Sequence, residues 1–117
     1  MIDGYTDPQR SRVGFGALLL GHHDTGGGLA YAGKVGTGFD NRTLRSLHAT
    51  LVHLEQDHSP FSRGRIPGLR SVHWVRPWLV GQVAFTEWTT DGQLRHPRFQ
   101  GLRDDKDPGD VVRELPD

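Results

Sequence analysis

The 117-residue sequence contains no cysteine. The fold therefore cannot be held by disulfide bonds, and no thiolate is present to bind zinc or to act as a nucleophile. Long apolar runs are also absent, because the longest, Ala17–Leu20, is much too short to span a membrane. No signal-peptide pattern opens the chain. We therefore expect a cytoplasmic protein with no membrane partner.

The sequence also lacks net charge, but the zero total hides an asymmetry. Residues 1–103 hold twelve Arg and Lys against eight Asp and Glu, whereas residues 104–117 hold two against six. The body is thus mildly basic and the tail acidic, and overall neutrality says little about the partners.

Hydrophobic residues make up only 34% of the chain, yet they recur in clusters that can build one modest core. A length of 117 residues suits a single domain. Sixteen glycines and seven prolines imply many turns, which favours a small β-rich domain over a helix bundle.

The order of local patterns predicts five strands and one helix. Asp40 is a plausible N-cap, and Leu44, Leu47, Leu51 and Leu54 fall at helical spacing after it. The expected strands are Met1–Tyr5, Val13–His23, Leu29–Val35, Leu79–Thr89 and Leu94–Leu102, with the helix over Asn41–Gln56 and an irregular loop over 57–73. A helix between the third and fourth of five strands is the order of the mainly β OB-fold, a Greek-key barrel.

The segment Leu94–Lys106 reads LRHPRFQGLRDDK. It resembles the last conserved motif of ATP-dependent DNA ligases, a Pro-Arg-Phe strand followed by Arg-x-Asp-Lys. Upstream blocks resemble the bacterial end-joining (ligase D-like) members of that family, in the same order. They are Ile2–Thr6, Gly14–Gly21, Tyr31–Phe39, Trp74–Val80 and Phe85–Thr89, with Gln82 and Ala84 standing where acidic residues are expected.

The resemblance implies an OB-fold domain over residues 1–106 and an acidic, flexible tail over 107–117. It implies that the domain helps clamp nicked duplex DNA and presents Arg103, Asp105 and Lys106 to the β- and γ-phosphates of ATP during lysine adenylation. An Arg fork and a Lys charge suit that task, and Asp105 could orient one of them. The implied partners are a nucleotidyltransferase domain and a DNA end-binding protein, and the implied setting is DNA repair by end joining at the nucleoid.

A second group of residues is expected to contact DNA or phosphate. Lys34, Gly36 and Thr37 lie in a glycine-rich segment whose backbone can approach a phosphate closely. Arg12 belongs to a set of loop arginines that could contact the sugar-phosphate backbone, with Arg10, Arg63, Arg65 and Arg70. Arg98 suits either a phosphate or a core carboxylate such as Glu87.

The catalytic nucleophile of the family is missing from this sequence. That lysine lies in a Lys-x-Asp-Gly motif, which neither Lys34 nor Lys106 matches. We therefore expect the chain to be part of a ligase and inactive alone, with ATP and Mg²⁺ belonging to the complete enzyme and neither bound tightly here. The seven histidines show no metal-ligand spacing, so no metal site is expected.

Two other functions remain open. The chain could be an OB-fold module that binds nucleic acid without a part in catalysis, with Trp74, Trp78 and Trp88 stacking on bases; their apolar neighbours favour core or barrel-edge packing instead. It could also belong to an RNA-capping enzyme or RNA ligase, against which the blocks around Gly14 and Trp74 argue.

Overall fold

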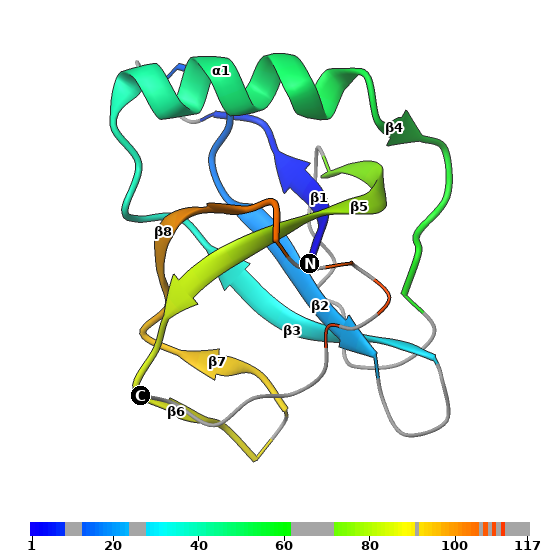
Figure 1. Ribbon diagram of the computed structural model, residues 1–117, viewed down its shortest axis with the longest axis vertical. Helices are drawn as coiled ribbons and strands as arrows, with labels where there is room; N and C mark the ends of the chain where they lie inside the picture. The colour runs from blue at the N-terminus through cyan, green and yellow to red at the C-terminus, as the bar shows by residue number, and fades with distance from the viewer. Residues whose placement is uncertain are drawn as a thin grey trace.

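The computed structural model describes residues 1–8, 13–23, 28–61, 72–90, 92–105, 107, 109 and 111. In this part of the chain, one helix lies among short and long strands (Figure 1). The elements are β1 (Ile2–Thr6), β2 (Leu18–His23), β3 (Leu29–Val35), α1 (Asn41–Val52), β4 (Glu55–Gln56), β5 (Val72–Ala84), β6 (Glu87–Trp88), β7 (Leu94–Arg95) and β8 (Arg98–Arg103).

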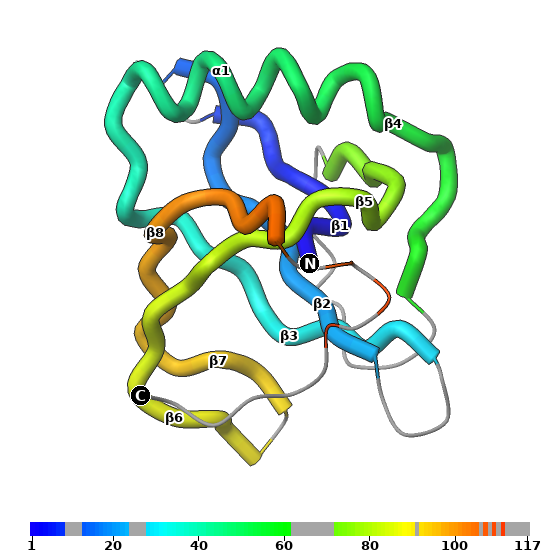
Figure 2. Tube along the Cα trace, viewed as in Figure 1, coloured from blue at the N-terminus to red at the C-terminus, as the bar shows by residue number. Residues whose placement is uncertain are grey.

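An antiparallel sheet with the order β3-β2-β1-β5-β4 forms the body of the domain. The 13-residue strand β5 pairs with β1 and β4 along its first part, and with β8 from Val80 to Ala84. The sheet curls into a half-barrel with α1 across one end (Figure 2). The five longer strands β1, β2, β3, β5 and β8, with α1 between the third and fourth, confirm the predicted OB-fold-like order.

Interruptions of the ladders help the sheet to curl. The register shifts between Ile2 and Gly4, between Leu20 and Gly21, and between Gln82 and Val83. Such bulges bend a strand and increase its twist. The Phe99 amide also donates to the Thr37 carbonyl at 2.9 Å, which ties the end of β3 to the start of β8.

The helix begins as predicted but ends four residues earlier. The Asp40 carboxylate accepts from the Thr43 amide at 2.7 Å, which confirms the N-cap. Beyond Val52 the chain is held by β5 instead, since Arg76 donates from Nη2 to the His53 carbonyl at 3.1 Å and from its amide to the Leu54 carbonyl at 2.8 Å. Glu55 and Gln56 then form β4, so the predicted helical end at Gln56 was wrong.

The bounds of three predicted strands were also wrong. The strand expected from Val13 begins at Leu18, because Gly14 has a φ of 76° and the Gly16 amide donates to Thr6 rather than continuing a ladder. The strand expected over Leu79–Thr89 begins earlier, at Val72, and ends at Ala84, so it takes residues from the predicted loop 57–73. The last strand is divided at His96, whose φ of 53° interrupts it, into β7 and β8.

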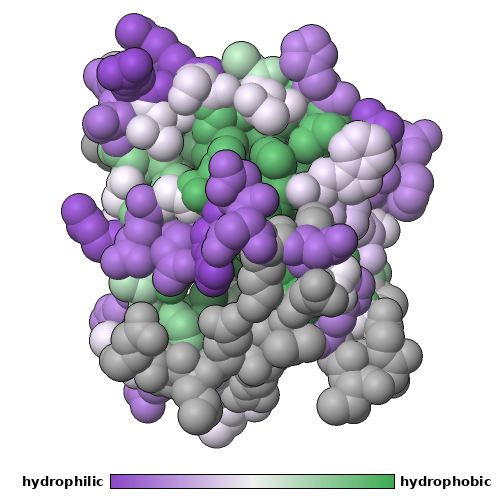
Figure 3. Space-filling model, in the orientation of Figure 1, coloured by the Kyte–Doolittle hydropathy of each residue, from purple (hydrophilic) through white to green (hydrophobic). Residues whose placement is uncertain are grey.

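The core lies between the inner face of the sheet and the leucine face of α1. Leu44, Leu47 and Leu51 are buried there, as predicted, while Leu54 packs at its edge. Apolar side chains are visible between the helix and the strands below it, and hydrophilic side chains surround them (Figure 3). The rest of the buried cluster comes from the strands and their connections: Ile2, Tyr5, Phe15, Leu18, Leu20, Ala32, Val35, Val75 and Phe99.

Candidate functional site

Arg103 and Asp105 form an ion pair at the end of β8. Arg103 is the last residue of the strand and pairs with Val80 of β5, which fixes its backbone. Its Nε donates to Asp105 Oδ1 at 3.2 Å and its Nη2 donates to Oδ2 at 3.1 Å. This fork-to-fork geometry is the strong, orienting form of an Arg–carboxylate contact. The Arg103 side chain is 34% exposed and that of Asp105 is 68% exposed, so solvent reaches both.

A small cavity of about 100 Å³ lies beside Arg103. Its lining is mainly apolar, with His22 and Gln82 as further polar members. The apolar lining comes from β2, from the later part of β5 and the residue after it, and from the β6–β7 hairpin: Leu20, Val80, Val83, Phe85, Trp88 and Leu94. Val111 of the tail also lines the cavity, and its carbonyl accepts from the His23 amide at 2.7 Å. Arg103 is thus part of the wall of this cavity.

The glycine-rich loop after β3 packs against the start of β8. Thr37 donates from Oγ1 to the Pro97 carbonyl at 3.3 Å and accepts from the Phe99 amide. Gly38 has a φ of 95°, and a Cβ on it would lie 2.7 Å from the Phe99 nitrogen, so the close approach needs glycine. Arg98 lies between these two contacts and is exposed. The structure thus brings Arg98 beside Gly36 and Thr37.

Lys34 lies two residues before Gly36, near the end of β3. Its side chain is exposed and its backbone pairs with Leu19 of β2. The alternative role of Arg98 as a partner of Glu87 is not supported, because the Glu87 carboxylate pairs with Arg95 Nε at 2.8 Å. Lys106, Arg12 and the other loop arginines lie outside the described residues.

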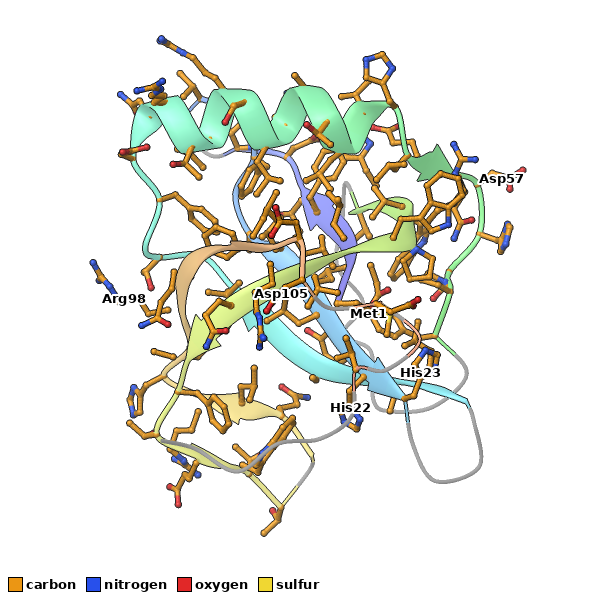
Figure 4. The ribbon with its side chains drawn as sticks, in the orientation of Figure 1. Met1, His22, His23, Asp57, Arg98 and Asp105 are labelled. Carbon is orange, nitrogen blue, oxygen red and sulfur yellow. The ribbon has the colours of Figure 1, made fainter. Side chains whose placement is uncertain are left out.

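The predicted site residues therefore fall into two groups. The loop-side group comprises Lys34, Gly36, Thr37 and Arg98, and the motif-side group comprises Arg103 and Asp105. At the usual rise of a strand, Arg98 and Arg103 are about 16 Å apart. Arg98 points outward at the edge of the domain in Figure 4, whereas Asp105 lies near the middle of the face. Arg98 and Arg103 therefore lie at opposite ends of β8.

Asp3 is a buried carboxyl that the sequence analysis did not single out. It is fully buried in β1, and neither carboxylate oxygen has a hydrogen-bond partner among the described residues. Burial raises the pKa of Asp3 to about 8, and the nearby Met1 ammonium group lowers it by less. A polar residue between Ile2 and Gly4 in a strand at the centre of the sheet was the available signal.

A polar cluster joins β1, β4 and β5 away from Arg103. The Tyr5 hydroxyl donates to Glu55, and the Tyr5 ring stacks on His73 with 4.7 Å between centroids. His73 Nε2 contacts Asp7 Oδ1 at 2.6 Å. Burial, followed by the Glu55 hydrogen bond, raises the pKa of Tyr5 above its ordinary value. We interpret the cluster as structural, since its members bind one another.

The three tryptophans differ in how far they are exposed. Trp78 is 60% exposed, in contrast to the partly buried Trp74 and Trp88, and of these two Trp88 packs against the buried core. Within the described ranges, no His, Asp and Glu side chains gather in a group of three that could hold a metal ion. No helix in that part of the chain is long and apolar enough to cross a membrane.

Sequence comparison identifies the family. The profile of the family described as "ATP dependent DNA ligase C terminal region" matches residues 11–106. The chain belongs to this family. Its relatives include the multifunctional non-homologous end joining protein LigD of Mycolicibacterium smegmatis, 47% identical over 97% of this chain and 15% of the relative. The LigD protein of Pseudomonas aeruginosa is 40% identical over 99% of this chain and 14% of the relative.

Solved structures agree with the family assignment. The chain superposes on the ligase domain of Mycobacterium tuberculosis LigD with a TM-score of 0.86 and 41% identity, over 97% of this chain and 37% of that one. A mycobacterial DNA ligase D complexed with ATP gives a TM-score of 0.83 at the same identity. The chain thus spans about one seventh of the curated relatives and about one third of their ligase domain.

Proposed function

We propose that this chain acts in nick sealing by an ATP-dependent DNA ligase. In this proposal it helps clamp nicked duplex DNA and presents Arg103, Asp105 and Lys106 to the β- and γ-phosphates of ATP. The attacking lysine belongs to the adenylation domain of the same ligase, because no Lys-x-Asp-Gly motif is present here. The relatives' role in non-homologous end joining extends the proposal to DNA repair at the nucleoid, with a DNA end-binding protein as a further partner.

The Arg103–Asp105 pair is the observation that carries the proposal. Lysine adenylation expels pyrophosphate, and its transition state is stabilised by fixed positive charge near the β- and γ-phosphates. Asp105 holds both Nε and Nη2 of Arg103, so the guanidinium plane has a defined orientation before any ligand arrives. Arg103 is partly exposed at the end of β8, where a ligand can reach it.

ATP and Mg²⁺ are assigned to the joint active site. ATP supplies the adenylyl group, and Mg²⁺ offsets phosphate charge when it is bound. This chain contributes a guanidinium and, in the proposal, the Lys106 ammonium. Asp105 is engaged with Arg103, which suits an orienting role better than metal binding.

The loop-side group is proposed to contact the sugar-phosphate backbone of duplex DNA. Lys34 and Arg98 supply exposed charge, and Gly36 lets the backbone approach a phosphate. This contact needs neither ATP nor the adenylation domain. A non-catalytic nucleic-acid-binding module would use the same contact. Only an experiment on the motif-side group therefore distinguishes a ligase domain from such a module.

The test combines this chain with the adenylation domain of its ligase and measures two steps separately. We expect Arg103→Ala to slow AMP transfer to the lysine by about 100-fold or more, the usual cost of removing one charge-stabilising donor. Sealing of DNA that is already adenylated at the nick should stay close to the wild-type rate. Arg95→Ala is the matched control, since Arg95 is also half-exposed and paired with a carboxylate, on the β6–β7 hairpin.

Arg98→Ala should give the opposite result. We expect weaker binding to nicked duplex DNA and an unchanged rate of AMP transfer. The slope of the logarithm of the DNA-binding constant against the logarithm of the salt concentration should fall in magnitude by about one, the contribution of one phosphate contact. If Arg103→Ala instead transferred AMP at the wild-type rate while the chain still bound DNA, presentation of the motif would be wrong and the binding module would be the better description.

A further inference from the structure

The Trp78 side chain is the most exposed of the large hydrophobic groups in the described residues. It is 60% exposed, compared with 49% for Leu102 and 46% for Val52. A large aromatic ring in water forfeits the burial free energy that the other aromatic side chains of this domain gain. Tryptophan is enriched at interfaces, so a ring this exposed is available to contact a partner.

The Trp78 ring is held in place from one side. The guanidinium carbon of Arg76 lies 4.6 Å from the ring centroid, within the range of a cation–π contact. Arg76 is itself fixed, because its Nη2 donates to the His53 carbonyl and its amide donates to the Leu54 carbonyl. Pro77, between the two residues, further limits the backbone. The ring is therefore an ordered platform, anchored through Arg76 to the end of α1.

The platform lies near the motif-side group. Trp78 precedes Val80 by two residues, and Val80 is the ladder partner of Arg103. Two residues along a strand correspond to about 7 Å. A nucleotide whose phosphate approached Arg103 could thus place a neighbouring base near Trp78. The Arg76 guanidinium beside the ring adds a positive charge that favours a polyanion over a neutral protein surface, whereas the charge of Arg103 is offset by Asp105 until a phosphate competes for it.

We propose that Trp78 is a stacking platform for an unpaired nucleobase at a DNA end. The inference rests on the proposed DNA-binding function. Bases inside a duplex have both faces covered by their neighbours, so the free face of an exposed ring fits a base in a single-stranded overhang. Stacking is tolerant of sequence, because every base has a π-face, and the Arg76 contact holds the ring in place for it. The platform would therefore favour DNA ends with overhangs over blunt ends, without reading their sequence.

The test is a binding titration of the 117-residue chain with two DNAs of equal duplex length, one blunt and one with a short 3′ overhang. Wild-type protein is compared with Trp78→Ala, Trp78→Phe and the control Val52→Ala. We expect Trp78→Ala to lose about 5- to 100-fold in affinity for the overhang DNA and little for the blunt DNA. Trp78→Phe should retain most of the preference and Val52→Ala all of it. The tryptophan emission of the wild type should be quenched by the overhang DNA more than that of Trp78→Phe.

The other outcomes separate this inference from the proposed function. Equal binding of both DNAs by wild type and Trp78→Ala would overturn the stacking platform and leave DNA clamping intact. A wild-type chain that binds neither DNA would overturn both. If Trp78→Ala bound the overhang DNA normally but no longer associated with the adenylation domain, Trp78 would be a protein contact and the proposal would be wrong. Circular dichroism of each variant confirms folding.

Discussion

Replacing Asp3 by Asn should remove a pH dependence of stability that the buried carboxyl creates. Asp3 is fully buried and lacks a hydrogen-bond partner among the described residues. Its pKa is about 8 in the folded chain, compared with an ordinary value of 3.8. Between these values the folded chain keeps a proton that the unfolded chain has released. The stabilising effect of that proton is complete below pH 3.8, and it is lost as the pH rises towards about 8.

The size of the effect follows from one proton of difference. Each pH unit inside that window lowers the free energy of unfolding by roughly 1.4 kcal/mol. From pH 5 to pH 7 the loss attributable to Asp3 is about 3 kcal/mol, an order-of-magnitude figure that is large against the total stability of a small domain. Asn keeps the size of the side chain and cannot ionise. The buried amide can change the free energy of unfolding by an amount that is the same at every pH, but the variant should lack the pH-dependent loss.

Urea unfolding followed by circular dichroism at several pH values from 5 to 8 measures the effect. The difference between wild type and Asp3→Asn should change by about 3 kcal/mol between pH 5 and pH 7. Asp57→Asn serves as the control. The His58 hydrogen bond lowers the pKa of the exposed Asp57, so any contribution of Asp57 to stability is lost as the pH falls, whereas that of Asp3 is lost as the pH rises. Parallel curves for wild type and Asp3→Asn would show that Asp3 is ionised in the fold, and the reasoning from burial would fail.

Two further predictions concern local structure. Gly38→Ala should cost at least about 1–2 kcal/mol in urea unfolding, because its φ of 95° disfavours a side chain and the new Cβ would meet the Phe99 backbone. Gly92→Ala, with a φ of 78° but open space around it, should lower the free energy of unfolding by less than Gly38→Ala does. If both substitutions cost the same, the contact with the Phe99 backbone would not contribute to the cost. Asp40→Ala should lower the melting temperature at pH 7 and have less effect in acid. This is expected since hydrogen bonds from Thr43 lower the pKa of Asp40, so its stabilisation exists above the ordinary pKa of 3.8 and fades below it. Asp40→Asn should keep the cap at both pH values.

Local patterns predicted the elements whose contacts are local. The strand Leu29–Val35 has the predicted bounds because a short, mainly apolar stretch lies between two glycine-rich segments. The N-cap at Asp40 was correct because its partner, Thr43, is three residues away. The end of the helix was wrong because Glu55 and Gln56 pair with β5, about twenty residues away, and Arg76 of that strand binds the carbonyls of His53 and Leu54. No periodicity in the helix itself carries that information.

The candidate site follows the same division. Arg103 and Asp105 are two residues apart, so a sequence motif could suggest their contact, and the bidentate pair is present; their role towards ATP stays a prediction. The neighbours of Arg98 depend on the contact of Thr37 with Pro97, sixty residues apart, which only the barrel creates. The burial of Asp3 and the exposure of Trp78 likewise depend on how the sheet curls.

The geometry of β8 limits how the two groups of charged residues can act. Arg98 and Arg103 lie at opposite ends of a strand whose ladder with β5 runs from Ala84 to Val80, so their separation is fixed by backbone hydrogen bonds. A change of ligand at one end cannot move the other end without breaking that ladder. If the motif-side group serves ATP and the loop-side group serves DNA, the exchange between the two must come from movement of the whole domain. The free energy of that movement would then depend on contacts with the adenylation domain. A substitution at one end of β8 should change the affinity for the ligand bound at that end, and it should not change how binding of ATP affects binding of DNA.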